Sequence, residues 1–331
     1  MPHLLVLSGA DVRQALGWAE CTDAMRFALV ARARGEAFQP LRTVLSPDGA
    51  AGLQVLMPAY GAQGYGLKAI CVTPGNPALG LDSHQGIVLL SRPDTGEPVA
   101  VLNASAVTEI RTAAVSAVAT SLLANPGADV LAIIGTGVQA HAHLRAISAG
   151  RPLSRVQVAG SSPAKADSFA RATTSPGLPV LACPSPREAV AGAGIVVTVT
   201  TAAEPVLRRD WLAPGAHVNA VGACLPRVRE LDTATMADAA LFADSRESVL
   251  AEAGDYLLAA AESAIGPGHI RAEIGDLLAA ESAASGAAGR RDASEITVFE
   301  SLGLAVEDLA AADLAYWTAR DRGLGTSVDF G

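Results

Sequence analysis

The sequence predicts an α/β protein that joins a doubly wound parallel Rossmann-type sheet to an α+β domain containing an antiparallel meander. Two observations support this prediction. From residue 130 onward, short apolar runs alternate with helix-length connections, which is the pattern of a parallel sheet covered by helices. Between residues 41 and 102, five apolar runs follow one another at hairpin spacing with turn sequences between them, which is typical of antiparallel strands.

Composition and charge limit the class of protein. At 331 residues, with 50% hydrophobic and 17% charged residues, the chain can bury a large core and is expected to form two domains. A net charge of −9 argues against nucleic acid or an anionic membrane as a main partner. The four cysteines are scattered without a C-x-x-C pair, and we recognise neither a signal peptide nor a membrane-spanning run. We therefore expect a reduced, cytoplasmic protein without a disulfide framework or a metal site.

The first part of the chain begins with helices and continues as strands. A helix capped by Asp11 runs to about Ala19, and a second covers residues 22–34 and is closed by Gly35. A long alanine-rich helix at residues 108–123 leads out of the meander. The expected strands of the meander lie at residues 41–45, 53–59, 66–72, 86–90 and 99–102.

The second part of the chain reads as the parallel sheet. Beyond residue 245 we expect helices, broken at residues 266–268 and by a loop at 285–291. A last helix, at residues 306–320, is expected to pack back on the first domain. The predicted domains are residues 1–112 plus 303–331, for substrate binding and dimerisation, and residues 113–302, for dinucleotide binding. The expected parallel strands lie at residues 130–134, 155–159, 178–182, 195–200, 216–221 and 239–243.

A glycine turn between the strand at 130–134 and the following helix predicts the nucleotide site. Gly135 permits a tight turn after the strand, and Gly137 lets the backbone come close to a pyrophosphate; Thr136 lies between them. Ala140 occupies the third small position, where helix and strand pack closely. The N–H groups and dipole at the helix start favour an anion there. The alternative is a plain strand-to-helix turn without a ligand.

The end of the second parallel strand bears on which nicotinamide cofactor binds. NAD-specific folds usually carry an acid there to hold the ribose 2′-hydroxyl. Here Ser161, Ser162 and Lys165 follow the strand, and the first acid is Asp167. Two hydroxyls and a cation suit a 2′-phosphate, so the sequence favours NADP(H), and NAD(H) is the alternative. Without a ligand, the same residues would be a small-residue turn followed by a surface lysine.

A series of ordered motifs resembles the ornithine cyclodeaminase/mu-crystallin family over nearly the whole chain. The series matches more specifically than the glycine turn alone. Its members are residues 40–42 (PLR), 66–68 (GLK), 74–77 (PGNP), 80–81 (GL), 108–114 (TEIRTAA), the glycine turn with Gln139, 221–223 (VGA), 229–232 (RELD) and 299–303 (FESLG).

The resemblance implies a homodimer, a substrate that bears a carboxylate, and a set of site residues. Arg42, Lys68 and Arg111 would hold the carboxylate. The sequence supports this independently, because a lysine in an apolar strand and an arginine on a small-residue helix face need an anion when buried. Each could instead pair with an internal Asp or Glu, or extend to solvent. The positions expected to contact the nucleotide by resemblance are Ser83, Thr112, Val138, Gln139, Thr200, Val221, the adjacent Gly222, and Ser301.

One position departs from the family. Cyclodeaminases and alanine dehydrogenases of this family carry an acid/base aspartate two residues after the Val-Gly pair, where this chain has Cys224. A thiol is mostly neutral at pH 7 and replaces a carboxylate poorly. Reduction of a protonated imine needs only a hydride and a docked carboxylate, so it suffers less from this loss, and ketimine reductases of the family also lack the aspartate. Cys224 could otherwise be a small buried filler.

We therefore expect an NADPH-dependent reductase of cyclic or linear imino acids (ketimines). An alternative is a cyclodeaminase or an alanine-type amino-acid dehydrogenase that uses another base. A second alternative is a non-catalytic NADP-dependent binding protein. The substrate's side chain is not indicated by the sequence.

Overall fold

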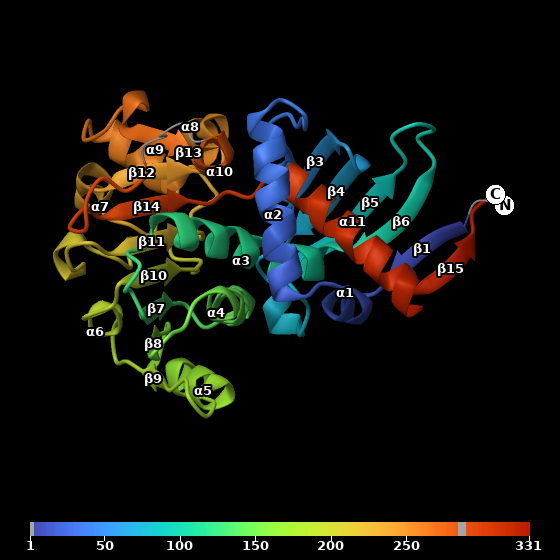
Figure 1. Cartoon of the computed structure of the whole chain (residues 1–331). Helices are drawn as coiled ribbons and strands as arrows, with labels where there is room; N and C mark the ends of the chain where they lie inside the picture. The colour runs from blue at the N-terminus through green and yellow to red at the C-terminus, as the bar shows by residue number, and fades with distance from the viewer. Residues whose placement is uncertain (1–2, 284–288) are drawn as a thin grey trace. The chain divides into compact units, whose positions relative to one another are not determined.

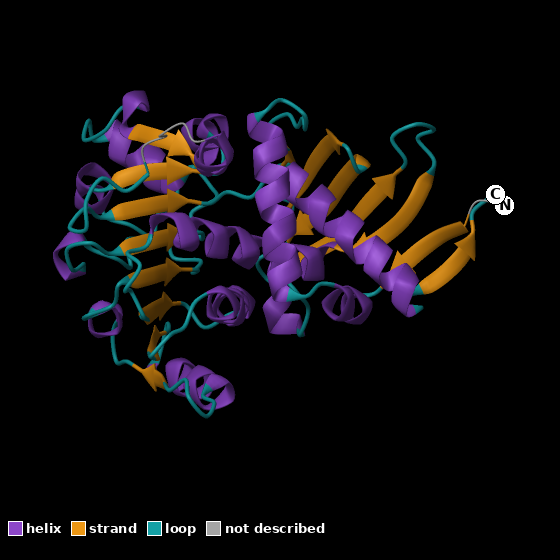
Figure 2. Ribbon diagram, viewed as in Figure 1, coloured by secondary structure: helices purple, strands orange, loops and turns teal. Residues whose placement is uncertain are grey.

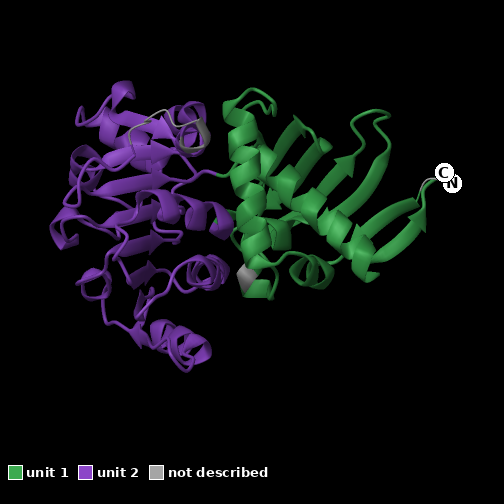
Figure 3. Cartoon of the chain, in the orientation of Figure 1, with its two compact units in different colours: residues 1–112, 303–331 green, residues 113–302 purple. Residues whose placement is uncertain are grey.

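The computed structural model describes residues 3–283 and 289–331 (Figure 1). The chain divides into two compact units, unit 1 with residues 1–112 and 303–331 and unit 2 with residues 113–302 (Figure 3). The boundary falls inside helix α3 (Ala104–Leu123), after Thr112.

Unit 1 contains a seven-stranded sheet in the order β15-β1-β6-β5-β4-β3-β2, in which only β1 and β6 are parallel. Helix α11 lies against β3, β4 and β5 and packs on α1 and α2 (Figure 1). The elements are β1 (His3–Leu7), α1 (Gly9–Ala15), α2 (Trp18–Ala33), β2 (Thr43–Leu45), β3 (Leu53–Gly61), β4 (Gly64–Val72), a 3₁₀ turn (Asn76–Leu79), β5 (His84–Ser91), β6 (Pro98–Asn103), α11 (Ala305–Arg322) and β15 (Thr326–Asp329).

Unit 2 contains an all-parallel sheet in the order β13-β12-β14-β11-β10-β7-β8-β9 (Figure 2). The order reverses at β7, so the crevice beyond the carboxyl ends of β7 and β10 is where such a sheet binds ligands. The elements are β7 (Val130–Ile134), α4 (Val138–Gly150), β8 (Arg155–Ala159), α5 (Pro163–Thr173), β9 (Val180–Ala182), α6 (Pro186–Val190), β10 (Ile195–Thr198), a 3₁₀ turn (Arg209–Trp211), β11 (His217–Ala220), α7 (Thr233–Asp238), β12 (Ala240–Ala243), α8 (Arg246–Glu252), α9 (Gly254–Ala261), a 3₁₀ turn (Pro267–His269), β13 (Ile270–Glu273), α10 (Ile274–Ala283) and β14 (Thr297–Glu300).

The predicted fold class is confirmed, and several elements differ from expectation. The segment beyond residue 245 is not all helical, because it contributes β13, β14 and β15. Each is four residues long, and β14 is stabilised by pairing with both β11 and β12. The first helix is capped by Ser8 rather than Asp11. Asp11 lies at N3, and its carboxylate accepts a hydrogen bond from the Ser8 N–H. Part of the loop expected at residues 285–291 lies outside the described residues.

Helix α3 is a core helix. Among the described residues it alone has the length and apolar composition of a membrane-crossing helix, and 78% of its most apolar window is buried inside the protein.

Candidate functional site

The turn after β7 has the backbone geometry that a pyrophosphate site needs. Gly135 has φ +128°, and a Cβ there would lie 2.6 Å from the carbonyl oxygen of Val199. Gly137 is the N-cap of α4, has no side-chain cap, and a Cβ there would meet nothing within 4 Å. Space at the helix start, together with the N–H groups that a helix leaves without intrahelical partners, fits a phosphate. Val138 and Gln139 form the first turn of α4.

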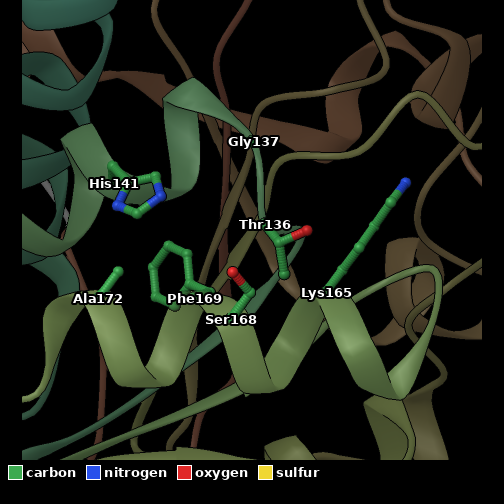
Figure 4. A pocket seen from close by; sticks show the side chains of 7 residues that line it. All are labelled: Thr136, Gly137, His141, Lys165, Ser168, Phe169 and Ala172. Carbon is green, nitrogen blue, oxygen red and sulfur yellow. The ribbon is translucent and has the colours of Figure 1, made fainter.

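The loop after β8 places two hydroxyls and one ammonium beside this turn. Ser162 caps α5, and the Lys165 Nζ donates to Ser161 Oγ at 3.1 Å. Figure 4 shows Lys165 rising from α5 beside Thr136. The pocket between the glycine turn and α5 is lined by Thr136, Gly137, His141, Lys165, Ser168, Phe169 and Ala172.

Four more predicted nucleotide residues lie on the same edge of the unit 2 sheet. Thr200 follows β10, Val221 and Gly222 follow β11, and Ser301 follows β14. These three strands are parallel neighbours, so their carboxyl ends meet at one edge. The two remaining nucleotide positions, Ser83 and the buried Thr112, belong to unit 1. The predicted nucleotide residues are therefore divided between the two units.

Cys224 lies in the loop after β11 and packs partly against the hydrophobic core of unit 2. Its thiol donates to the carbonyl oxygen of Val221 at 3.3 Å. This environment suits a small apolar side chain with one weak donor.

In unit 1 two of the three predicted cations form ion pairs with two carboxylates. Lys68 of β4 forms an ion pair with Asp308 at 2.7 Å, between Nζ and Oδ2. Arg111 of α3 donates from Nε to Asp308 Oδ1 and from NH1 to Glu307 Oε2, both at 2.9 Å. All four side chains are buried. The partly buried Arg42 donates to the carbonyl oxygen of Gly303 at 3.2 Å. We call these five charged residues the cation cluster.

The pairing with internal acids, stated above as an alternative for Lys68 and Arg111, is what the structure shows for both. Glu307 and Asp308 were not expected, because acids in the first turn of a helix are common for dipole reasons alone. The cation cluster thus contains three cations and two carboxylates, and the ion pairs join Lys68 and Arg111 to the two acids.

Burial and mutual attraction set the charge states of the cluster. Burial lowers the pKa of Lys68 to about 8, against the opposing pull of Asp308. Burial works to raise the pKa of Asp308, but Arg111 and Lys68 together hold it below its ordinary value. Burial, followed by the charges of Lys68 and Arg111, lowers the pKa of His84. His84 therefore stays neutral near the cluster, and the sequence analysis had not identified it.

Gly303 is needed where α11 begins. Its φ is +78°, and a Cβ there would collide with the guanidinium of Arg111. Its carbonyl oxygen also accepts a hydrogen bond from Arg42. The glycine thus lets the backbone pass between two cations of the cluster.

Comparison with known proteins shows which family the chain resembles in sequence and structure. The model of the ornithine cyclodeaminase/mu-crystallin family matches residues 3–323. Ketimine reductase mu-crystallin of Mus musculus is 42% identical over 85% of each chain. The structure of Thermococcus litoralis Δ1-pyrroline-2-carboxylate reductase in complex with NADH and L-proline is 35% identical, with a TM-score of 0.93, over 98% of this chain and 100% of that one. An archaeal alanine dehydrogenase dimer with bound NAD is 30% identical, also with a TM-score of 0.93, over 99% of this chain and 100% of that one.

Asp308 should be essential for the stability of unit 1. The Asp308→Ala variant leaves two buried cations short of an anion, and we expect a loss of about 3–5 kcal/mol in the free energy of unfolding. Urea unfolding measures it. Asp313→Ala, a partly buried acid of the same helix that accepts from Trp317, is the matched control. Equal losses in the two variants would contradict the role given to Asp308.

Proposed function

The chain belongs to the ornithine cyclodeaminase/mu-crystallin family, and we propose that it reduces an imino acid to the amino acid with a nicotinamide cofactor, NADPH in preference to NADH. The observation that carries the proposal is the cation cluster, which brings the buried Lys68 and Arg111 together with the partly buried Arg42. The reductases among its relatives support the same reaction class.

The chain's own residues contribute binding and orientation. Arg42, Lys68 and Arg111 hold the carboxylate beside the C=N bond, and the planar guanidinium groups suit a planar carboxylate. Because Asp308 fixes Lys68 and Arg111 before the substrate arrives, little reorganisation is needed on binding. The glycine turn and the loops after β8, β10 and β11 would hold the cofactor, which would supply the hydride for the imine carbon.

Cys224 favours reduction over the alternatives. A cyclodeaminase or dehydrogenase must remove a proton from an ammonium group, which the family's aspartate performs, and a thiol that donates to Val221 is a poor base. A protonated imine is already activated. The cation cluster in turn favours an enzyme over a protein that only binds the nucleotide.

A panel of substrates distinguishes these functions. Cyclic and linear imino acids are given with NADPH and L-alanine with NADP⁺ while nicotinamide absorbance is followed. Ornithine is given with NAD⁺ while released ammonia is measured, because cyclodeamination returns the hydride and leaves the absorbance unchanged. We expect turnover of at least one imino acid and little with the other two. Faster turnover of ornithine or alanine, or nucleotide binding without any turnover, would reject the proposal. We also propose a cytoplasmic location, which the four free cysteines support.

The cofactor preference rests on Ser161, Ser162 and Lys165. NADPH should bind at least about tenfold more tightly than NADH, a difference of about 1.4 kcal/mol. Ser161→Asp should move the preference toward NADH, because a carboxylate beside Lys165 repels the 2′-phosphate. Ser175→Asp, on an exposed loop of the same unit, is the charge-matched control. Equal affinities in the parent, measured by fluorescence titration, would overturn the preference.

The outer face of the unit 1 sheet supports a homodimer. Helix α11 covers one face, while the other presents Leu56, Tyr60, Tyr65, Leu67 and Ile87, of which Tyr65 is 51% exposed. An apolar face of this kind suits a second copy of the chain. Light scattering should give twice the 33.5 kDa of one chain, and Tyr65→Glu should give the monomer. Leu181→Glu, on the exposed side of β9, should leave the mass unchanged; a monomeric parent would contradict the dimer.

Lys68 predicts a pH limit on carboxylate binding. Its pKa is lowered to about 8, so the ammonium is present below that pH and is lost as the pH rises through it. Pyrrole-2-carboxylate, whose ring nitrogen does not titrate, should inhibit competitively and lose affinity above pH 8. The groups that influence Lys68 are Asp308, Arg111 and Arg42. An inhibition constant that stays flat from pH 7 to about pH 10, where an ordinary lysine titrates, would exclude Lys68 from the clamp.

Cys224→Asp tests whether position 224, in the loop after β11, is where the family carries its acid/base aspartate. The introduced carboxylate should favour amino-acid oxidation over imine reduction, and Cys224→Ala should keep reduction within about tenfold of the parent. Cys183→Asp, after β9 in the same unit, is the control and should change neither direction. Loss of reduction in a folded Cys224→Ala variant would make the thiol a participant in the reaction.

A further inference from the structure

Glu230, in the 229–232 motif, has no assigned role so far. Its side chain is fully buried. One carboxylate oxygen, Oε1, accepts the backbone N–H of Thr200 at 2.6 Å, and the other, Oε2, accepts that of Gly222 at 2.7 Å. A single side chain therefore connects the loop after β10 to the loop after β11.

The structure holds Glu230 itself in place. Asp255 of α9 accepts the backbone N–H groups of both Glu230 and Leu231 through Oδ1, each at 2.8 Å. The carbonyl oxygen of Glu230 accepts the N–H groups of Val206 and Leu207 at 2.7 and 2.9 Å. These hydrogen bonds fix the backbone of Glu230, and its carboxylate reaches both loops from that fixed position.

Gly222 fits closely against Glu230. A Cβ at position 222 would lie 2.6 Å from the Glu230 carboxylate and would collide with the carbonyl oxygen of Thr200. The glycine therefore allows the two loops and the carboxylate to come together.

A carboxylate is costly at this place. Burial raises the pKa of Glu230, and burial likewise raises the pKa of Asp255 to about 8. Glu300, buried near both, is also shifted upward by burial and by its acidic neighbours. An amide side chain would avoid the repulsion, but it offers one acceptor oxygen where two backbone donors must be satisfied. A glutamate carboxylate supplies one acceptor oxygen for each of the two backbone N–H groups.

We propose that Glu230 is a positioning residue for the nicotinamide end of the cofactor. Strands β7, β8 and β9 form the half of a doubly wound sheet that holds the adenosine side, and β10 and β11 belong to the other half. Glu230 fixes Thr200 and Gly222 on that second half without touching the cofactor. The inference needs the dinucleotide site, but it does not depend on the identity of the imino acid.

Glu230→Gln tests the inference by comparing two ligands. NADPH carries the nicotinamide ring, whereas 2′-phospho-ADP-ribose is the same molecule without it. The variant loses one of two acceptors, so NADPH should bind about tenfold more weakly, while 2′-phospho-ADP-ribose stays within about twofold of the parent. Equal losses for both ligands would indicate a general structural role, and unchanged NADPH affinity would also overturn the proposal.

Two further variants make the test decisive. Glu300→Gln replaces another buried acid of the same unit, at the end of β14, whose pKa burial raises, and both affinities should stay within about twofold of the parent. Gly222→Ala leaves the carboxylate in place but forces the two loops apart, and it should reproduce the selective loss of NADPH if Glu230→Gln does not fold. A Gly222→Ala variant that binds NADPH as tightly as the parent would contradict the link between the loops.

Discussion

The buried contact of Asp308 with Lys68 and Arg111 is the interaction on which unit 1 depends. It joins strand β4, helix α3 and helix α11, which are distant in the sequence, through ion pairs of 2.7 and 2.9 Å. Burying these charges is expensive unless each is compensated, and Glu307 and Asp308 compensate Lys68 and Arg111. The same contact therefore fixes two of the three cations that we propose for binding the substrate carboxylate.

Unit 2 uses a buried carboxylate in a related way. Glu230 satisfies two backbone donors of separate loops, as Asp308 satisfies two cations of separate elements. In both units a fully buried acid binds, and so fixes, the residues that we propose to contact a ligand. Such preorganisation is the contribution expected of a protein in which the cofactor carries the hydride and no carboxylate occupies position 224.

The sequence predicted the parts of the fold that rest on local patterns. Strands β7 and β8 begin and end at the predicted residues. Strand β7 is a five-residue apolar run, and β8 carries Val156, Val158 and Ala159 in a short segment bounded by turn signals. Strands β13, β14 and β15 have four residues each, and their strand character depends on partners elsewhere in the chain. Local patterns carry no record of such partners. Likewise, Lys68 and Arg111 could be recognised as candidate site residues because they are cations in apolar surroundings. Their partner Asp308 is some 200 residues away from Arg111, and the packing of α11 on the sheet was needed to identify it.

The most direct test of the carboxylate clamp is the dependence of turnover on the substrate's carboxylate. Δ1-Pyrroline-2-carboxylate and 1-pyrroline share the cyclic imine and differ in that one group. With saturating NADPH, loss of a charge-assisted carboxylate contact to the cation cluster should lower kcat/KM for 1-pyrroline by at least about 100-fold, since more than one such contact is removed at once. Equal kcat/KM values for the two imines would show that the cluster of Arg42, Lys68 and Arg111 serves the fold alone.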